Sequence, residues 1–112
     1  MTKSNGTNPI SEPVFYILLS LASGQKHGYA ILKDLEMLSE RSVMLSTSTL
    51  YSALTRLEDQ GLVERIPVEA STAPGLPRKV YELTTQGLNL LNVETRRLKR
   101  QVAHASRYLA LD

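Results

Sequence analysis

The amino-acid sequence predicts a mainly α-helical protein with one small β-hairpin, on three observations. In two stretches the apolar residues recur at i, i+4 and i+7, the spacing of one face of a helix. Farther along, two short β-prone segments flank a loop rich in proline and glycine. A last stripe, with alternating spacings of four and three residues, continues to the end of the chain. The 112 residues are enough for one domain and too few for two independent cores.

The first helix is expected directly after a polar start. Residues 1–10 are rich in Thr, Ser, Asn and Gly, which is typical of a disordered arm. Ser11 then fits a capping position, Glu12 a first turn, and Pro13 a position where no intrahelical donor is lost. Because residues 14–19 are apolar nearly all round, we expect this helix to be buried, partly by another chain.

A second amphipathic helix is predicted over residues 26–39. Ile31, Leu35 and Leu38 are spaced so that they fall on one face of it. The short segment Val43–Leu45 is β-compatible and predicts a brief strand before the next helix.

The third helix is predicted over residues 47–60. Ser46 offers an N-cap side chain, and Gly61 is well placed to end the helix in a left-handed conformation. The inward face is expected to consist of Leu50, Leu54 and Leu57.

A hairpin and a long final helix complete the predicted order. Residues 62–66 and 79–83 are β-prone, and prolines and a glycine interrupt the loop between them. Thr84 fits the cap of a last helix that reaches as far as Leu111.

This order of elements is that of a winged helix–turn–helix domain. We expect residues 1–10 to form the arm, residues 11–83 the winged domain, and residues 84–112 a C-terminal dimerisation helix.

The third predicted helix has a polar face that the core does not use. Ser48, Ser52 and Arg56 point away from its leucines, while Thr47 and Thr49 crowd its N-terminus. Short hydroxyl side chains let a helix end approach a phosphate or a base edge, and the unpaired N–H groups there favour an anion. In helix–turn–helix proteins this end enters the major groove of DNA. The alternative is that these residues only cap the helix.

Two further places carry groups that suit phosphate binding. Lys26 and Tyr29 stand at the start of the second predicted helix, where Gly28 would permit close backbone approach. Arg78 and Lys79 stand at the ascending strand of the hairpin, within reach of a DNA backbone or a minor groove. Taken singly, each of these cations is more often a solvated surface charge.

Five segments, in this order and spacing, closely resemble the PadR family of transcriptional regulators. The resemblance covers about residues 14–110, and the chain is similar to the short subfamily with a single C-terminal helix. The segments are residues 17–22 (ILLSLA), 27–31 (HGYAI), 46–54 (STSTLYSAL), 57–63 (LEDQGLV) and 81–87 (YELTTQG).

The resemblance implies a homodimeric repressor that binds a palindromic operator in double-stranded DNA. It also implies release by a small aromatic effector bound near the dimer interface, although the chain has no tryptophan for indole stacking. Tyr51 has two alternative roles, because its ring could pack while its hydroxyl reaches a phosphate. At the hairpin tip, residues 73–77 (APGLP) depart from the more basic sequence of many members. The residues that the resemblance and the polar face assign to DNA are Lys26, Tyr29, Thr47, Ser48, Thr49, Tyr51, Ser52, Arg56, Arg78 and Lys79.

The stripe on the last helix predicts the dimer interface. Thr84, Leu88, Leu91, Thr95, Leu98, Val102, Ala105 and Leu109 are separated alternately by four and three residues. We expect Leu88 and Leu91 to pack on their own domain. The later positions have little of their own molecule to cover them, so a partner helix is the expected solution. The predicted interface consists of Phe15, Leu98, Val102, Ala105 and Leu109.

Charge is unevenly divided along the chain. Residues 84–112 carry five basic and two acidic side chains, and residues 1–83 carry eight and nine. The run Arg96–Arg100 could contact DNA, but the solvated face of a helix is the favoured alternative. Because the predicted DNA-reading part is not cationic as a whole, affinity would rest on individually placed contacts.

Several other classes of protein are disfavoured. The chain has no cysteine, and His27 and His104 are far apart and outside any triad or metal-ligand spacing, so we expect no enzyme, metal or cofactor. No apolar run approaches the ~20 residues of a membrane span, and a cytoplasmic protein is expected. The net charge of only +2 keeps open a winged-helix module that binds protein instead of DNA.

Overall fold

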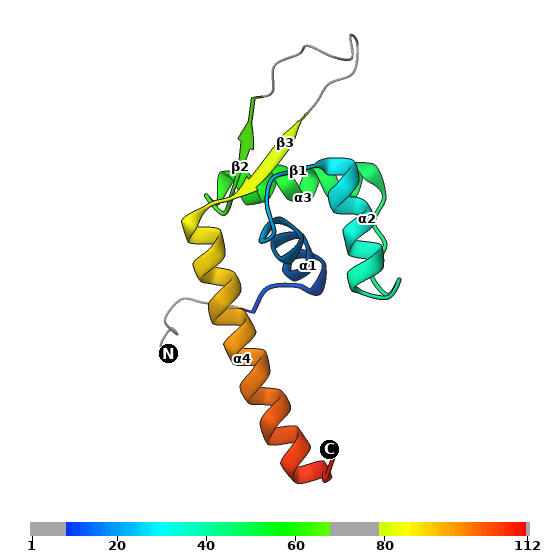
Figure 1. The fold of residues 1–112 in the computed structure, drawn as a ribbon, viewed down its shortest axis with the longest axis vertical. Helices are drawn as coiled ribbons and strands as arrows, with labels where there is room; N and C mark the ends of the chain where they lie inside the picture. The colour runs from blue at the N-terminus through cyan, green and yellow to red at the C-terminus, as the bar shows by residue number, and fades with distance from the viewer. Residues whose placement is uncertain (1–8, 68–78, 112) are drawn as a thin grey trace.

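The computed structural model describes residues 9–67 and 79–111, and it has the winged helix–turn–helix fold (Figure 1). The helices are α1 (Glu12–Leu21), α2 (Gly28–Leu38), α3 (Thr47–Asp59) and α4 (Thr85–Leu109). The strands are β1 (Lys26–His27), β2 (Val63–Ile66) and β3 (Val80–Leu83), which form an antiparallel sheet in the order β1-β3-β2. The predicted mainly helical fold with a small hairpin is therefore confirmed.

All three predicted N-caps are present. The side-chain oxygens of Ser11, Ser46 and Thr84 each accept a hydrogen bond from the backbone N–H three residues later, at 3.3, 3.1 and 3.0 Å. Each such cap stabilises a helix by about 1 kcal/mol. Gly61 has a φ of 78° directly after α3, as predicted, because a residue with a Cβ rarely adopts that conformation.

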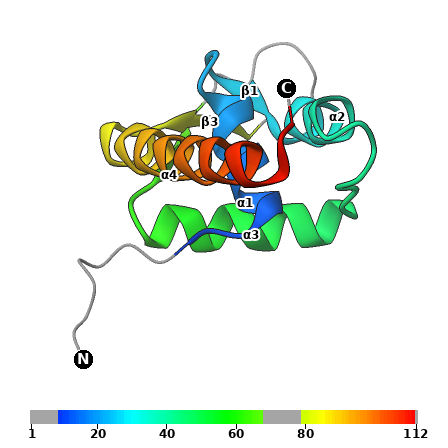
Figure 2. The same ribbon diagram turned by 90° about the horizontal axis from the view of Figure 1, so that it is seen from below.

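The core is formed where the first three helices meet. Ile17 and Leu18 of α1, Ile31 of α2, and Leu50 and Leu54 of α3 are fully buried. Figure 2 shows α1 between α3 and α4, so that α1 is the centre of the domain.

A tight turn joins α2 to α3. Glu40 and Arg41 both have left-handed backbone conformations, with φ of 54° and 70°, and the Arg41 N–H donates to the Glu36 carbonyl at 2.7 Å. The buried Ser39 hydroxyl accepts from the Val43 N–H at 2.9 Å. These bonds hold the chain in a compact turn directly after α2.

The third strand lies elsewhere than predicted. The prediction of a strand at Val43–Leu45 is wrong, because the backbone there is bonded to the turn through Ser39 and not to the sheet. The predicted helix start at Lys26 is also wrong. Lys26 and His27 form β1, which pairs with Tyr81 and Val80, and α2 begins at Gly28.

Helix α4 packs on the domain only with its first half. Gly87, Leu91 and Glu94 are buried there, and the second half projects beyond the rest of the molecule (Figure 1). The expected packing of Leu91 is confirmed, but that of Leu88 is wrong, since 44% of Leu88 is exposed. The inward face follows positions 87, 91 and 94, which turns position 88 outward.

Candidate nucleic-acid interface

Helix α3 presents a polar face on the side away from the core. Leu50 and Leu54 are fully buried and Leu57 is 3% exposed. The opposite face carries the exposed side chains of Ser48 and Ser52, and Arg56 continues it toward the C-terminal end. The heptad-like spacing of the leucines therefore fixes which side of α3 a second molecule can contact.

The start of α3 combines a satisfied cap with exposed hydroxyls. The Ser46 hydroxyl accepts from the Thr49 N–H at 3.1 Å and donates to the Thr49 hydroxyl at 2.9 Å. The N–H groups of a first helical turn have no intrahelical acceptor. The cap satisfies that of Thr49, while Thr47 and Ser48 lie exposed at the helix end. An anion placed at this end would meet backbone N–H groups and hydroxyls together.

Tyr51 joins α3 to α2 and to the base of the hairpin. Its ring lies 6.3 Å from the Tyr81 ring, and the Lys79 ammonium lies 5.8 Å from its centre. Its hydroxyl fills the space beside Gly28, where an added Cβ would lie 2.2 Å from the oxygen. Gly28 thus makes room for Tyr51, a packing role that local sequence did not indicate.

Lys26 is engaged within the protein. Its ammonium forms an ion pair with the carboxylate of Asp34 on α2, which also accepts a hydrogen bond from the Ser20 hydroxyl of α1 at 2.8 Å. These three residues tie β1, α2 and α1 together. The proposed phosphate contact of Lys26 would have to be made in addition to this ion pair, and it stays a prediction.

The Asp34 carboxyl is held in its charged form. Partial burial acts to raise the pKa of Asp34, but the hydrogen bonds from Lys26 and Ser20 and the Lys26 charge outweigh it, so the pKa lies below its usual value. A lowered folded-state pKa means that the unfolded chain binds more protons as the pH falls. The ion pair therefore stabilises the fold at neutral pH and loses this effect in acid.

Replacing Asp34 with Asn tests this pH dependence. We expect D34N to be less stable than the wild type at pH 7, and the difference to shrink as the pH falls below about 4, where the carboxyl of the unfolded chain is protonated. Urea unfolding of both proteins between pH 3 and 7 measures it. A difference that stays constant over this range would show that the charge of Asp34 contributes nothing.

Of the remaining residues that were predicted to contact DNA, some are exposed and one lies outside the described residues. Tyr29 is 67% exposed at the start of α2, with the Lys33 ammonium 5.7 Å from its ring centre. Lys79 is exposed and lies directly before the first residue of β3. Arg78 and the hairpin tip lie outside the described residues. In Figure 1 the start of α2 lies close to the base of the β2–β3 hairpin, so these groups adjoin one surface.

The second half of α4 carries an uncovered apolar stripe. Val102 and Leu109 are 62% and 65% exposed, Leu98 is 36% exposed, and Ala105 is also exposed. Phe15 is half-buried on α1 and packs edge-on against Tyr16, with ring centres 5.6 Å apart.

Sequence reasoning missed one buried charge beside this stripe. Glu94 is 2% exposed and forms an ion pair with Arg97 one turn later. The ion pair raises the pKa of the Arg97 guanidinium. Phe15 and Leu98, with these two residues, border a pocket of about 320 Å³ between α1 and α4. Tyr108, near the end of α4, is 86% exposed and does not line this pocket.

The described parts of the chain lack two other features, a metal cluster and a membrane-spanning helix. Residues 9–67 and 79–111 contain no cluster of three or more His, Asp or Glu side chains that could hold a metal ion. Among the described helices, none is both long and apolar enough to cross a membrane.

Comparison with known proteins decides the family. The model of the transcriptional regulator PadR-like family matches residues 17–93, which include α2, α3, both hairpin strands and the start of α4. The chain belongs to the PadR-like family. The predicted resemblance is therefore confirmed.

Solved PadR-like structures agree with the fold. A PadR family regulator from Clostridium difficile R20291 is 26% identical with a TM-score of 0.73, over 88% of this chain and 99% of that one. A transcriptional regulator from Clostridium thermocellum is 23% identical with a TM-score of 0.70, over 88% and 97%. Bacillus subtilis PadR, solved in complex with operator DNA, is 26% identical with a TM-score of 0.61, over 70% of this chain and 44% of that one. A search of curated proteins found no match.

Proposed function

We propose that this PadR-like chain is a homodimeric repressor that binds a palindromic operator and is released by a small aromatic effector. The observation that carries the proposal is the exposed, hydroxyl-rich start of α3, set on a rigid core and flanked by Tyr29 and Lys79. The similar Bacillus subtilis PadR was solved with operator DNA. The chain acts by occupying DNA and catalyses no reaction.

The proposed contacts divide into base-reading and phosphate-binding groups. Thr47, Ser48 and Ser52 would face base edges in the major groove, because they are short and exposed at the entering helix end. Tyr29, Thr49, Tyr51, Arg56 and Lys79, with Lys26 and Arg78, would hold the backbone on either side. In a twofold dimer, two α3 helices would meet successive major grooves about 34 Å apart.

A fluorescence-anisotropy titration with the DNA upstream of the protein's own gene tests the proposal. Tight binding that weakens steeply between two salt concentrations and resists unrelated competitor DNA is expected of a sequence-specific regulator. A winged-helix module that binds protein is the alternative. Failure to bind any DNA at low salt would favour that module and overturn the proposal.

The proposed dimer predicts a specific effect of charge on α4. Glutamate at Val102 would place like charges in the interface, so we expect V102E to raise the dimer dissociation constant at least about 30-fold. Sedimentation equilibrium of both proteins measures it. The matched control is V93E, which puts the same charge on an exposed residue of the first half of α4. Dissociation by V93E alone, or by neither variant, would place the interface elsewhere.

A further inference from the structure

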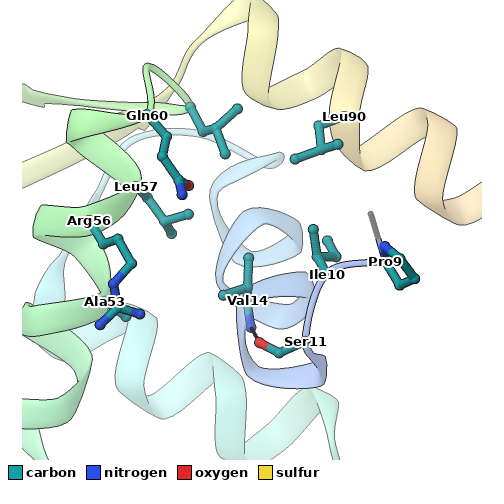
Figure 3. Close-up of a pocket in the computed structure, with 10 residues that line it drawn as sticks. Pro9, Ile10, Ser11, Val14, Ala53, Arg56, Leu57, Gln60 and Leu90 are labelled. Atoms are coloured by element: carbon teal, nitrogen blue, oxygen red, sulfur yellow. Dashed lines mark hydrogen bonds between the residues drawn. The ribbon is translucent and has the colours of Figure 1, made fainter. Parts of the chain in front are cut away.

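A pocket of about 320 Å³ lies beside the recognition helix, between α3, the start of α1 and α4 (Figure 3). Ala53, Arg56 and Leu57 of α3, with Gln60 directly after the helix, form one wall, and Val14 of α1 stands across from them. The pocket is separate from the one bordered by Phe15 and Arg97 between α1 and α4. Its apolar lining includes Ile10, Val14, Ala53, Leu57, Leu62 and Leu90.

One cation stands at the edge of this apolar lining. The salt bridges within the described residues engage Lys26, Arg65 and Arg97, and Arg56 takes part in none of them. The hydroxyl of Ser11, which also borders the pocket, is occupied by the α1 cap. The ligand chemistry that fits is therefore an apolar body with one anionic group, because a guanidinium binds carboxylate and sulfonate oxygens through paired hydrogen bonds.

Arg56 lies at the boundary between the pocket and the DNA face. It continues the ridge of Ser48 and Ser52 at intervals of four residues, and it also borders the pocket beside Ala53 and Gln60. One guanidinium can therefore serve a phosphate on one side or a ligand anion on the other. A ligand that holds Arg56 would remove a contact from DNA without any change of fold.

We propose that this pocket binds a small amphipathic anion, and that ligand and DNA compete for Arg56. The inference rests on the proposed function, and it names a site and a ligand chemistry for its release step. Because coupling between two sites is reciprocal, DNA lowers the affinity for the ligand by the same factor as the ligand lowers that for DNA.

A pair of fluorescent probes separates the charge from the apolar body. We would titrate 8-anilinonaphthalene-1-sulfonate and its uncharged counterpart N-phenyl-1-naphthylamine into the full-length protein without DNA. The anion should bind more tightly than the neutral probe. R56Q should weaken the anion about tenfold and leave the neutral probe unchanged. The matched control, R96Q, removes the same charge from an exposed position on α4 and should change neither.

A pocket-filling variant tests the location. A53L adds apolar volume to the α3 wall and should weaken both probes, with circular dichroism confirming that the variant is folded. Equal affinity of R56Q and wild type for the anion would overturn the proposal. So would unchanged probe binding by A53L, which would assign the probe to the Phe15 pocket or show that another copy covers this site.

The coupling is measured with DNA carrying a red-emitting label. The anionic probe should weaken binding to the own-promoter DNA, by about 5-fold or more, and A53L should abolish this effect. If the protein bound no DNA before any probe was added, the proposed function would be contradicted. The titrations without DNA would still show whether the pocket binds the anion. Unchanged DNA affinity at saturating probe would overturn the competition.

Discussion

Glutamate in place of Ser48 is expected to lower the affinity for operator DNA by at least about 100-fold, a change of roughly 3 kcal/mol. Ser48 is exposed in the first turn of α3, at the end that would enter the major groove. A carboxylate there would face the phosphates and cancel the attraction of the helix N-terminus for them. The fold should not suffer, because an acidic side chain in a first turn stabilises its own helix.

The control for this substitution uses the same position in another helix. Gln86 is exposed and occupies the second position of α4, as Ser48 does in α3. The start of α4 adjoins the opposite end of α3, where the Thr84 hydroxyl donates to the Gly61 carbonyl at 2.7 Å. Q86E should therefore bind DNA nearly as the wild type does. Anisotropy titrations compare the three proteins, and equal affinity of S48E and wild type would remove α3 from the DNA-binding surface.

Alanine in place of Gly87 should destabilise the fold by about 2–4 kcal/mol. Gly87 is buried in the first turn of α4, and an added Cβ would lie 2.1 Å from the Leu62 carbonyl oxygen and 2.8 Å from a methyl carbon of Leu83. The Leu62 oxygen belongs to the backbone and accepts the Thr84 N–H at 3.1 Å, so it has little freedom to move. Helix propensity alone predicts the opposite sign, a gain of about 1 kcal/mol.

Urea unfolding at one fixed protein concentration measures this effect and keeps any dimer contribution constant. The companion variant is N89A, which also introduces alanine into the first half of α4 but at an exposed position. It should be neutral or slightly more stable. Equal stability of G87A and wild type would mean that Gly87 does not pack on the Leu62 carbonyl as described.

The sequence predicted most of the fold because helix caps and helix faces are determined by residues only a few positions apart. The caps at Ser11, Ser46 and Thr84 need only one side chain three residues before a backbone N–H. The buried face of α3 follows from helical spacing, and so does the burial of Ile31 and Leu35 in α2. The prediction that Leu38 shares that face is wrong, because Leu38 is 40% exposed at the last position of α2. Strand β1 had no such signal, since its two residues become a strand only by pairing with Val80 and Tyr81, which are more than 50 positions away.

The candidate site was predictable in outline and not in its internal contacts. The exposed hydroxyls of α3 followed from the position of its leucines. The ion pair of Lys26 with Asp34 and the packing of Tyr51 on Gly28 depend on how separate elements meet. Glu94 was not among the predicted inward positions, because the predicted stripe ran through 88, 91 and 95, whereas the buried positions are 87, 91 and 94. A glutamate on the inward side of a helix carries no local sequence signal that an arginine three residues later will form an ion pair with it.

The projecting half of α4 also makes the helix a lever. Its 25 residues span about 37 Å at 1.5 Å per residue, and the packing of Gly87 against Leu62 fixes one end to the winged domain. If two copies join through the far half, a tilt of about 5° at the junction moves each domain by about 3 Å over that length. Two recognition helices that must reach grooves about 34 Å apart are sensitive to such a displacement. A small rearrangement in the seam between the long helices can thus be amplified into a mismatch with the double helix.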